Sequence, residues 1–246
     1  MTTDIQRSYI GVGKVLARAF GSTGRFRHVG NVSKLDASHK LDTKRQRDYT
    51  RTGGGTLIKV SRIDQVELAM TWLSFSPENY TLALAGNLAP VALGVVTAEV
   101  VKGYKGSTVP LAHPPSVITT VKDVATGAIT YVAGVDYEMS PSGLYIPDTS
   151  SIVDAADLTV AYSHAAYSRV EAAMVTSSLL ELLFEGLNEA DSNKPVIVNI
   201  WKADVPSADQ VQLIGDDLGK FDFKAECLKD STKGAGASAF YRALLL

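Results

Sequence analysis

The sequence predicts a mainly β protein with one flanking α-helix, a long hairpin arm and a β-rich insertion. Three observations predict this fold class. Several segments alternate apolar and polar side chains with a period of two, which is typical of half-buried strands. One segment carries a complete set of helix-start signals. Residues 103–168 contain short strand-like runs that turn residues separate.

The composition indicates a folded chain that needs no covalent staple. The chain has 246 residues, of which 46% are hydrophobic, with a single cysteine and a formal net charge of −2. A domain of this length buries enough surface to fold without a disulfide or a metal. One cysteine excludes zinc sites built from several thiolates. The longest apolar stretch, 82–101, is interrupted by Gly86, Pro90 and Glu99, so we expect no membrane-spanning helix.

The first predicted elements form the arm. Residues 25–43 and 56–63 have strand character and flank a polar centre, residues 42–55, which ends in three glycines. Glycine reaches backbone conformations with φ > 0 and weakens regular structure. We therefore expect an exposed hairpin arm with a loop of about 14 residues at its centre.

A strand and a helix follow the arm. Residues 66–75 predict a strand whose even-numbered side chains from Val66 to Trp72 share one face. Ser76-Pro77-Glu78 predicts a helix start, because Ser is a good N-cap, Pro suits the first turn and Glu complements the helix dipole. Gly86 and Pro90 end this helix, and residues 90–101 predict a buried strand.

The residue pattern changes in the middle of the chain. Residues 103–115 resemble a linker, and the strand-like runs after it are 116–121, 128–132, 135–139, 143–146 and 158–162. Strands this short and this closely spaced predict an antiparallel β insertion.

The carboxyl-terminal part predicts further strands. Residues 169–187 fit either an amphipathic helix or a buried strand, and periodicity alone leaves both open. Residues 196–201 predict a strand after a polar turn. Residues 221–227 alternate as a half-buried strand that directs Cys227 inward.

Charge is distributed unevenly along the chain. Residues 1–62 carry 13 Lys or Arg and 4 Asp or Glu, a net charge of +9, and residues 63–246 carry a net charge of −11. Three interpretations stay open: a solvated basic loop, a nucleic-acid contact, or self-association in which the basic segment of one copy meets the acidic body of the next.

No segment carries a recognisable catalytic motif. Gly11-Val-Gly13-Lys14-Val15 lacks both the first glycine of a phosphate loop and the Ser or Thr that binds magnesium. The four histidines, at positions 28, 39, 113 and 164, have no metal-ligand spacing. We therefore expect no enzyme, no cofactor and no metal, although distant residues can assemble a site without a local motif.

In the order of its segments and in their residue patterns, the chain resembles the bacteriophage tail tube proteins, also called major tail proteins. The resemblance covers residues 5–102 and 169–246, and 103–168 resembles an insertion. Four segments carry it: Arg27 to Leu35, the polar arm through Asp48-Tyr49 with Gly53-Gly54-Gly55-Thr56, the strand and helix of 66–79, and the carboxyl-terminal runs 183–188, 195–203, 213–218 and 221–230.

The resemblance implies a fold and a role. The fold is two packed antiparallel sheets that form a sandwich-like barrel, with residues 1–102 and 169–246 as the tail-tube domain and 103–168 as an inserted subdomain. It favours strand over helix for 169–187, and it implies that an apolar-anchored excursion joins the last strand pair. Copies form hexameric rings that stack into the virion's tail tube, built in the host bacterial cytoplasm. Partners are the tape-measure, tail terminator and baseplate or tip proteins, and DNA passes through the lumen at ejection.

The residues that we expect at the subunit interface lie on the arm. They are Lys44, Arg45, Arg47, Tyr49, Arg51, Gly53, Gly54 and Gly55. Two alternatives stay open beside the tail tube: a related assembly component, such as a tail terminator or a secretion-system tube, and a nucleic-acid-binding module that uses the same basic arm.

Overall fold

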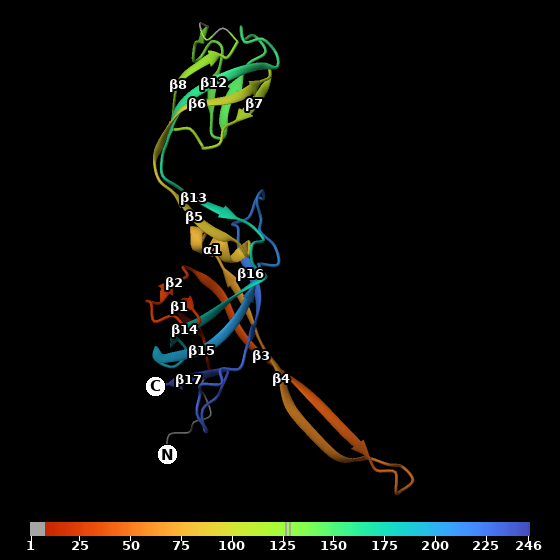
Figure 1. Ribbon diagram of the computed structural model, residues 1–246. Helices are drawn as coiled ribbons and strands as arrows, with labels where there is room; N and C mark the ends of the chain where they lie inside the picture. The colour runs from red at the N-terminus through yellow and green to blue at the C-terminus, as the bar shows by residue number, and fades with distance from the viewer. Residues whose placement is uncertain (1–7, 126, 128) are drawn as a thin grey trace. The chain divides into compact units, whose positions relative to one another are not determined.

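The computed structural model describes residues 8–125, 127 and 129–246 (Figure 1). The chain is mainly β, with several antiparallel sheets and one short helix, so the predicted fold class is confirmed. It divides into two compact units. The first contains the described residues up to Leu88 together with Val170–Leu246, and the second is Ala89–Arg169. Nowhere in the described residues is there a helix with the length and hydropathy of a membrane span.

The first unit is built on one eight-stranded antiparallel sheet in the order β2-β1-β14-β15-β16-β4-β3, with β17 also paired to β15. Its elements are β1 (Gly11–Ala19), β2 (Arg27–His28), β3 (Val32–Arg47), β4 (Thr56–Trp72), α1 (Pro77–Ala83), β14 (Ser177–Asn188), β15 (Lys194–Pro206), β16 (Phe221–Cys227) and β17 (Tyr241–Leu245). Strands from both halves of this sheet, including β1 and β4, line a single core. The arrangement is therefore sandwich-like, but the sheet ends at β2 and β3 and does not close into the expected barrel.

The core of the first unit follows the predicted alternation. Along β4, alternate side chains from Val66 to Trp72 are buried. The Trp72 ring packs against that of Phe223 on the paired strand β16, with ring centroids 4.9 Å apart. Cys227 is only 1% exposed, and burial, with a smaller effect of Glu226, raises the pKa of its thiol to about 12. The thiol is therefore a core side chain and not a nucleophile.

Helix α1 begins where the sequence predicts. The backbone N–H of Asn79 donates to the Ser76 hydroxyl at 3.2 Å, and Pro77 occupies the first turn. The Asn79 side chain is fully buried. Its amide donates to the carbonyls of Val29 at 2.6 Å and Ser74 at 2.8 Å, so the helix start holds together the segments before β3 and after β4.

The remaining strands form two smaller antiparallel sheets, β6-β12-β8-β9 and β10-β11-β7, and the two-stranded sheet β13-β5. Their bounds are β5 (Asn87–Val91), β6 (Gly94–Gly103), β7 (Ser107–Pro110), β8 (Val117–Asp123), β9 (Thr130–Tyr131), β10 (Glu138–Ser140), β11 (Gly143–Ile146), β12 (Ala156–His164) and β13 (Tyr167–Glu171). The first two sheets share a separate core that includes Leu144, Ile146 and Leu158. The predicted insertion, 103–168, lies inside the second unit, which also contains β6.

Several predicted elements differ from the observed ones. The single buried strand expected over 90–101 is two strands, β5 and β6, and the side chains of Val95 and Val100 are exposed. The linker-like segment 103–115 contains strand β7. The run 128–132 is represented by β9, and residue 128 lies outside the described residues. Within the ambiguous segment 169–187, the chain forms β13 and β14 and no helix.

Candidate assembly surface

The distal parts of β3 and β4 form a two-stranded arm (Figure 1). Strand β16 pairs with β4 only as far as Glu67, so beyond this point β3 and β4 pair only with each other. All side chains of β4 from Thr56 to Asp64 are exposed, whereas alternate ones are buried from Val66 on. We call residues 41–63 the arm.

The arm is more regular than the sequence predicts. Strand β3 continues through Arg47, so the expected loop over 42–55 is limited to residues 48–55. At the turn, the N–H of Asp48 donates to the carbonyl of Gly55 at 2.8 Å, and Gly53 has φ of +98°. The hydroxyl and the N–H of Thr50 both donate hydrogen bonds to the Asp48 carboxylate. These bonds lower the pKa of Asp48, and the bond from the hydroxyl has the larger effect. The turn is therefore closed by its own hydrogen bonds.

All the predicted interface residues lie on this arm. Lys44, Arg45 and Arg47 are on β3, and Tyr49, Arg51, Gly53, Gly54 and Gly55 are in the turn. Each of the five charged or aromatic side chains is exposed. At Gly54, a Cβ atom would lie 2.7 Å from the carbonyl oxygen of Asp48, so glycine permits the close approach of the chain there.

The register of β3 with β4 reveals an electrostatic conflict. Arg45 lies directly opposite Lys59, and directly opposed residues of an antiparallel pair point to the same face. Like charges in this position are destabilising. None of the arm's cations forms an ion pair with any residue that the structure describes; these cations are Lys44, Arg45, Arg47, Arg51, Lys59 and Arg62. The arm of an isolated copy thus carries uncompensated positive charge.

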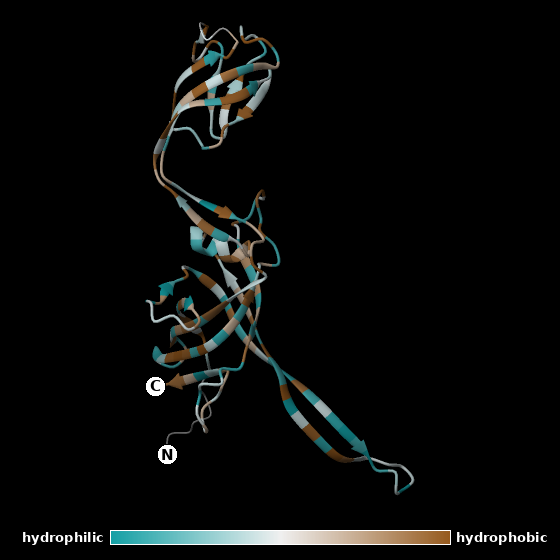
Figure 2. Ribbon diagram, viewed as in Figure 1, coloured by the Kyte–Doolittle hydropathy of each residue, from teal (hydrophilic) through white to brown (hydrophobic). Residues whose placement is uncertain are grey.

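The arm also exposes aliphatic side chains. Figure 2 shows that the arm part of β4 carries several apolar residues, whereas the arm part of β3 is mostly hydrophilic. Leu41 and Ile63 face each other across the ladder, and Ile58 and Val60 lie on the opposite face; all four are exposed. Because the arm has apolar groups on both faces and no second layer, it lacks a core of its own.

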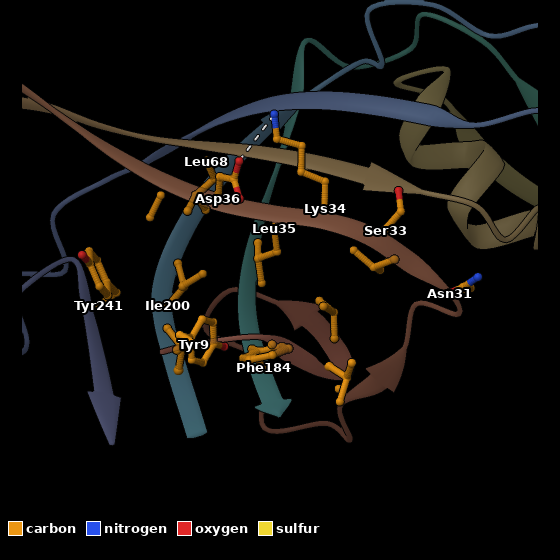
Figure 3. Close-up of a pocket in the computed structure, with 17 residues that line it drawn as sticks. Tyr9, Asn31, Ser33, Lys34, Leu35, Asp36, Leu68, Phe184, Ile200 and Tyr241 are labelled. Atoms are coloured by element: carbon orange, nitrogen blue, oxygen red, sulfur yellow. Dashed lines mark ion pairs between the residues drawn. The ribbon is translucent and has the colours of Figure 1, made fainter. Parts of the chain in front are cut away.

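A cavity of about 560 Å³ lies where the open sheet leaves β1 and β3 unpaired with each other. Tyr9, Leu35, Phe184 and Ile200 contribute to its mainly apolar wall (Figure 3). Its lining contains one ion pair, Lys34 to Asp36 at 3.5 Å, and neither histidine nor cysteine. This lining offers a surface for packing and no nucleophile–base pair.

A second exposed apolar segment lies between β15 and β16. Leu213, Ile214 and Leu218 are 80%, 96% and 94% exposed, and they flank the exposed carboxylates of Asp216 and Asp217. We call residues 213–218 the acidic loop. Its three aliphatic side chains are solvated in an isolated copy.

The chain on either side of the acidic loop is anchored. Ala208 and Val211 pack against the core of the first unit, so the excursion has apolar anchors at its start, as the resemblance implied. The N–H of Ala208 donates to the carbonyl of Ala83 in α1, and the N–H of Asp209 donates to that of Asp222, both at 2.9 Å. The acidic loop and the arm extend from opposite ends of the first unit (Figure 1).

The second unit brings together two histidines that are far apart in the sequence. The rings of His113 and His164 stack with centroids 4.2 Å apart, and the Tyr167 hydroxyl lies 2.9 Å from His113 Nδ1. The Tyr162 hydroxyl donates to Glu99 at 2.6 Å, and burial together with this bond raises the pKa of Tyr162 to about 12. Because the two imidazole rings are stacked in parallel, their nitrogen atoms do not converge on a common metal position. Among the described residues, no three His, Cys, Asp or Glu gather in a way that could hold a metal ion.

Sequence reasoning missed the histidine pair and the Arg45–Lys59 pair for the same reason. Neither pair is visible in a local pattern, because the Arg45–Lys59 pair depends on strand register and the histidine pair on how the segment before β8 folds against the end of β12. The aliphatic residues of 213–218 were visible in the sequence, but their exposure was not.

Comparison with known proteins places the chain in a family without an assigned activity. The family model described as "Protein of unknown function UCP028589" matches residues 8–244, and the chain belongs to this family. No curated protein matches the chain.

Proposed function

We propose that this member of a family of unknown function is a structural subunit that self-assembles into hexameric rings, which stack as a bacteriophage tail tube. The observation that carries the proposal is the arm, a long two-stranded extension with unpaired cations and exposed aliphatic side chains. An isolated two-stranded hairpin is marginally stable in water. A neighbouring copy would supply the second layer that the arm lacks and negative charge for its excess of cations.

The open sheet supports the same proposal. Its edges present unpaired backbone N–H and C=O groups, which favour pairing with another strand. Closure into a ring would satisfy these edges. Head-to-tail stacking of the rings would then extend them into a tube, because a heterologous contact that does not close builds a filament.

Partners and location follow from this role. In a tail tube the rings would meet tape-measure, tail terminator and baseplate or tip proteins, and DNA would pass through the lumen. The protein would be assembled in the host bacterial cytoplasm and act in the virion. A single-ring terminator and a secretion-system tube share the same physical basis, and micrographs separate rings from long tubes.

Electron microscopy of the concentrated protein tests the proposal. We expect rings and tubes from the natural chain. Reversing Lys44, Arg45, Arg47 and Arg51 to Glu should leave the circular dichroism spectrum unchanged and abolish tubes. A control variant, Lys105→Glu/Lys122→Glu, reverses two exposed cations of the second unit and should assemble normally. Normal tubes from the four-residue variant would contradict the role of the arm, and a natural chain that stays monomeric at high concentration would contradict self-assembly.

Nucleic-acid binding is a second candidate, which the face shared by Arg45 and Lys59 favours. Phosphate contacts release counterions, so DNA affinity would fall steeply as salt rises. Fluorescence anisotropy with duplex DNA at low salt measures this, and absence of binding removes the candidate.

A further inference from the structure

Among the described segments, the acidic loop complements the arm most closely in its charge and its exposed apolar surface. It combines three aliphatic side chains, each at least 80% exposed, with two carboxylates in six residues. Neither Asp216 nor Asp217 forms an ion pair with any described residue. The neighbouring cation, Lys220, is already engaged with Asp222, at 3.1 Å. The loop of one copy therefore has apolar surface and negative charge without partners among the described residues of its own chain.

We propose that the acidic loop of one copy receives the arm of a second copy. Arg45 and Lys59 on one arm face would approach Asp216 and Asp217, and the aliphatic residues of arm and loop would cover each other. The proposal rests on the proposed function, because it requires copies of the chain to associate through the arm.

Charge complementarity selects this occupant. The opposed Arg45 and Lys59 repel each other in the isolated arm, so a pair of carboxylates between them removes a cost as well as adding an attraction. Such complementarity fixes register and speeds encounter. The cavity between β1 and β3 offers the arm no such match, because its one acidic side chain, Asp36, is already paired with Lys34.

The placement of the two surfaces gives the contact a direction. The arm and the acidic loop lie at opposite ends of the first unit, so an arm reaches the loop of another copy and not its own (Figure 1). Each copy then offers an arm at one end and a receiving loop at the other. This is a heterologous contact, which repeats from copy to copy and builds a ring where its rotation closes and a stack where it does not.

A charge exchange tests the contact. Variant A is Arg45→Glu/Lys59→Glu, variant B is Asp216→Lys/Asp217→Lys, and variant C carries all four changes. We expect A and B each to raise the protein concentration needed for assembly by about tenfold or more, and C to return it towards the natural value, because the reversed charges again attract. Sedimentation and electron microscopy measure the assembled fraction.

The control for variant B is Glu138→Lys/Asp154→Lys, which makes the same charge change on exposed residues of the second unit. It should assemble as the natural chain does. Circular dichroism of each variant establishes that it is folded. A 1:1 mixture of A and B should assemble better than either variant alone, because alternating copies place opposite charges at every contact.

The outcomes separate this contact from the proposed function. If A blocks assembly while B assembles normally, or if C fails to recover, the arm docks elsewhere and the docking proposal is wrong although self-assembly stands. If A assembles normally, the arm face with Arg45 and Lys59 is not an interface and the docking proposal is wrong, whereas only a natural chain that stays monomeric contradicts self-assembly.

The apolar half of the contact has its own test. Ile214 is almost fully exposed, so Ile214→Ser should leave the thermal unfolding temperature of the monomer unchanged. It should weaken assembly severalfold, and this weakening should persist at high salt because salt screens only the charged part of the contact. Unchanged assembly of Ile214→Ser would exclude the loop from the interface.

Discussion

At the scale of single residues, Asn79 is a polar side chain that the fold constrains closely. It is fully buried, and three hydrogen bonds engage its side chain: two donated to backbone carbonyls, and one accepted by Oδ1 from Arg27 at 2.8 Å. A buried carbonyl that loses its donor keeps the cost of its desolvation. Asn79 therefore ties the segment before β3 to the start of α1.

Replacing Asn79 with Ala should destabilise the first unit by about 2–3 kcal/mol, because the carbonyls of Val29 and Ser74 would lose their donor. Urea unfolding followed by circular dichroism measures the change. Thr81→Ala on the same helix is the control, since it removes only an exposed hydroxyl bond to Pro77. Equal effects of the two substitutions would show that the buried bonds contribute nothing special.

Asp136 predicts how the second unit responds to acid. The N–H of Val132 donates to the Asp136 carboxylate at 2.8 Å, and the hydroxyl of Ser151 donates to it at 2.7 Å. These bonds lower the pKa of Asp136. Because the folded pKa lies below the unfolded one, of about 4, the ionised group stabilises the fold above that pH. This stabilisation is lost as the pH falls through the folded pKa.

Asp136→Asn should therefore lower stability at neutral pH and flatten its dependence on pH between about 5 and 2. Urea unfolding at a series of pH values, read from a probe in the second unit, checks this. The matched control is Asp148→Asn, which makes the same chemical change on an exposed residue of that unit. It should keep the natural acid dependence, and an equal flattening in both variants would show that the bonds of Asp136 are not its cause.

At the scale of elements, the pairing of β1 with β14 depends on two glycines that face each other. Gly13 lies opposite Gly186, and a Cβ on Gly13 would come within 2.4 Å of the carbonyl oxygen of Glu185 and 2.5 Å of the Gly186 Cα. Both contacts are with backbone, which cannot move away as a flexible side chain can. The two strands therefore approach more closely here than residues with side chains would permit.

Gly13→Ala should destabilise the first unit by about 1–3 kcal/mol through this overlap. Thermal unfolding compared with the natural chain measures the loss. Gly55→Ala is the control, because a Cβ at that position meets nothing within 4 Å. A neutral result for Gly13→Ala would mean that β1 shifts without cost.

The elements also show what the sequence can and cannot predict. Strand β16 and the start of α1 are local patterns, and both lie where the sequence predicts. The local pattern does not determine β14, because its leucines fit the periodicity of a helix as well as that of a strand. Its pairing with β1 and β15 decides in favour of the strand. The arm shows the opposite error, because charged residues through Arg47 suggest a loop although an exposed ladder accommodates them.

At the scale of the whole molecule, each unit has its own buried core. The core of the first contains Leu182 and Trp72, and that of the second contains Leu144 and Ile146. Separate cores favour separate cooperative unfolding. The boundary could not be placed from composition alone, because β6 is similar in character to the strands before it and only its pairing with β12 assigns it to the second unit.

Calorimetry should therefore resolve two transitions. Leu144→Ala should lower the unfolding free energy of one by about 2–5 kcal/mol, and Leu182→Ala that of the other by a similar amount. If either substitution shifted both transitions equally, the units would unfold as one.

The buried thiol has a practical consequence. The chain has a single cysteine, and because Cys227 is sequestered and resists ionisation, the folded surface presents no reactive thiol to maleimides. Reductants would then have no effect on the association of folded copies. A cysteine introduced on the surface would report on its own position alone, so the natural chain is a ready background for mapping contacts by chemical labelling.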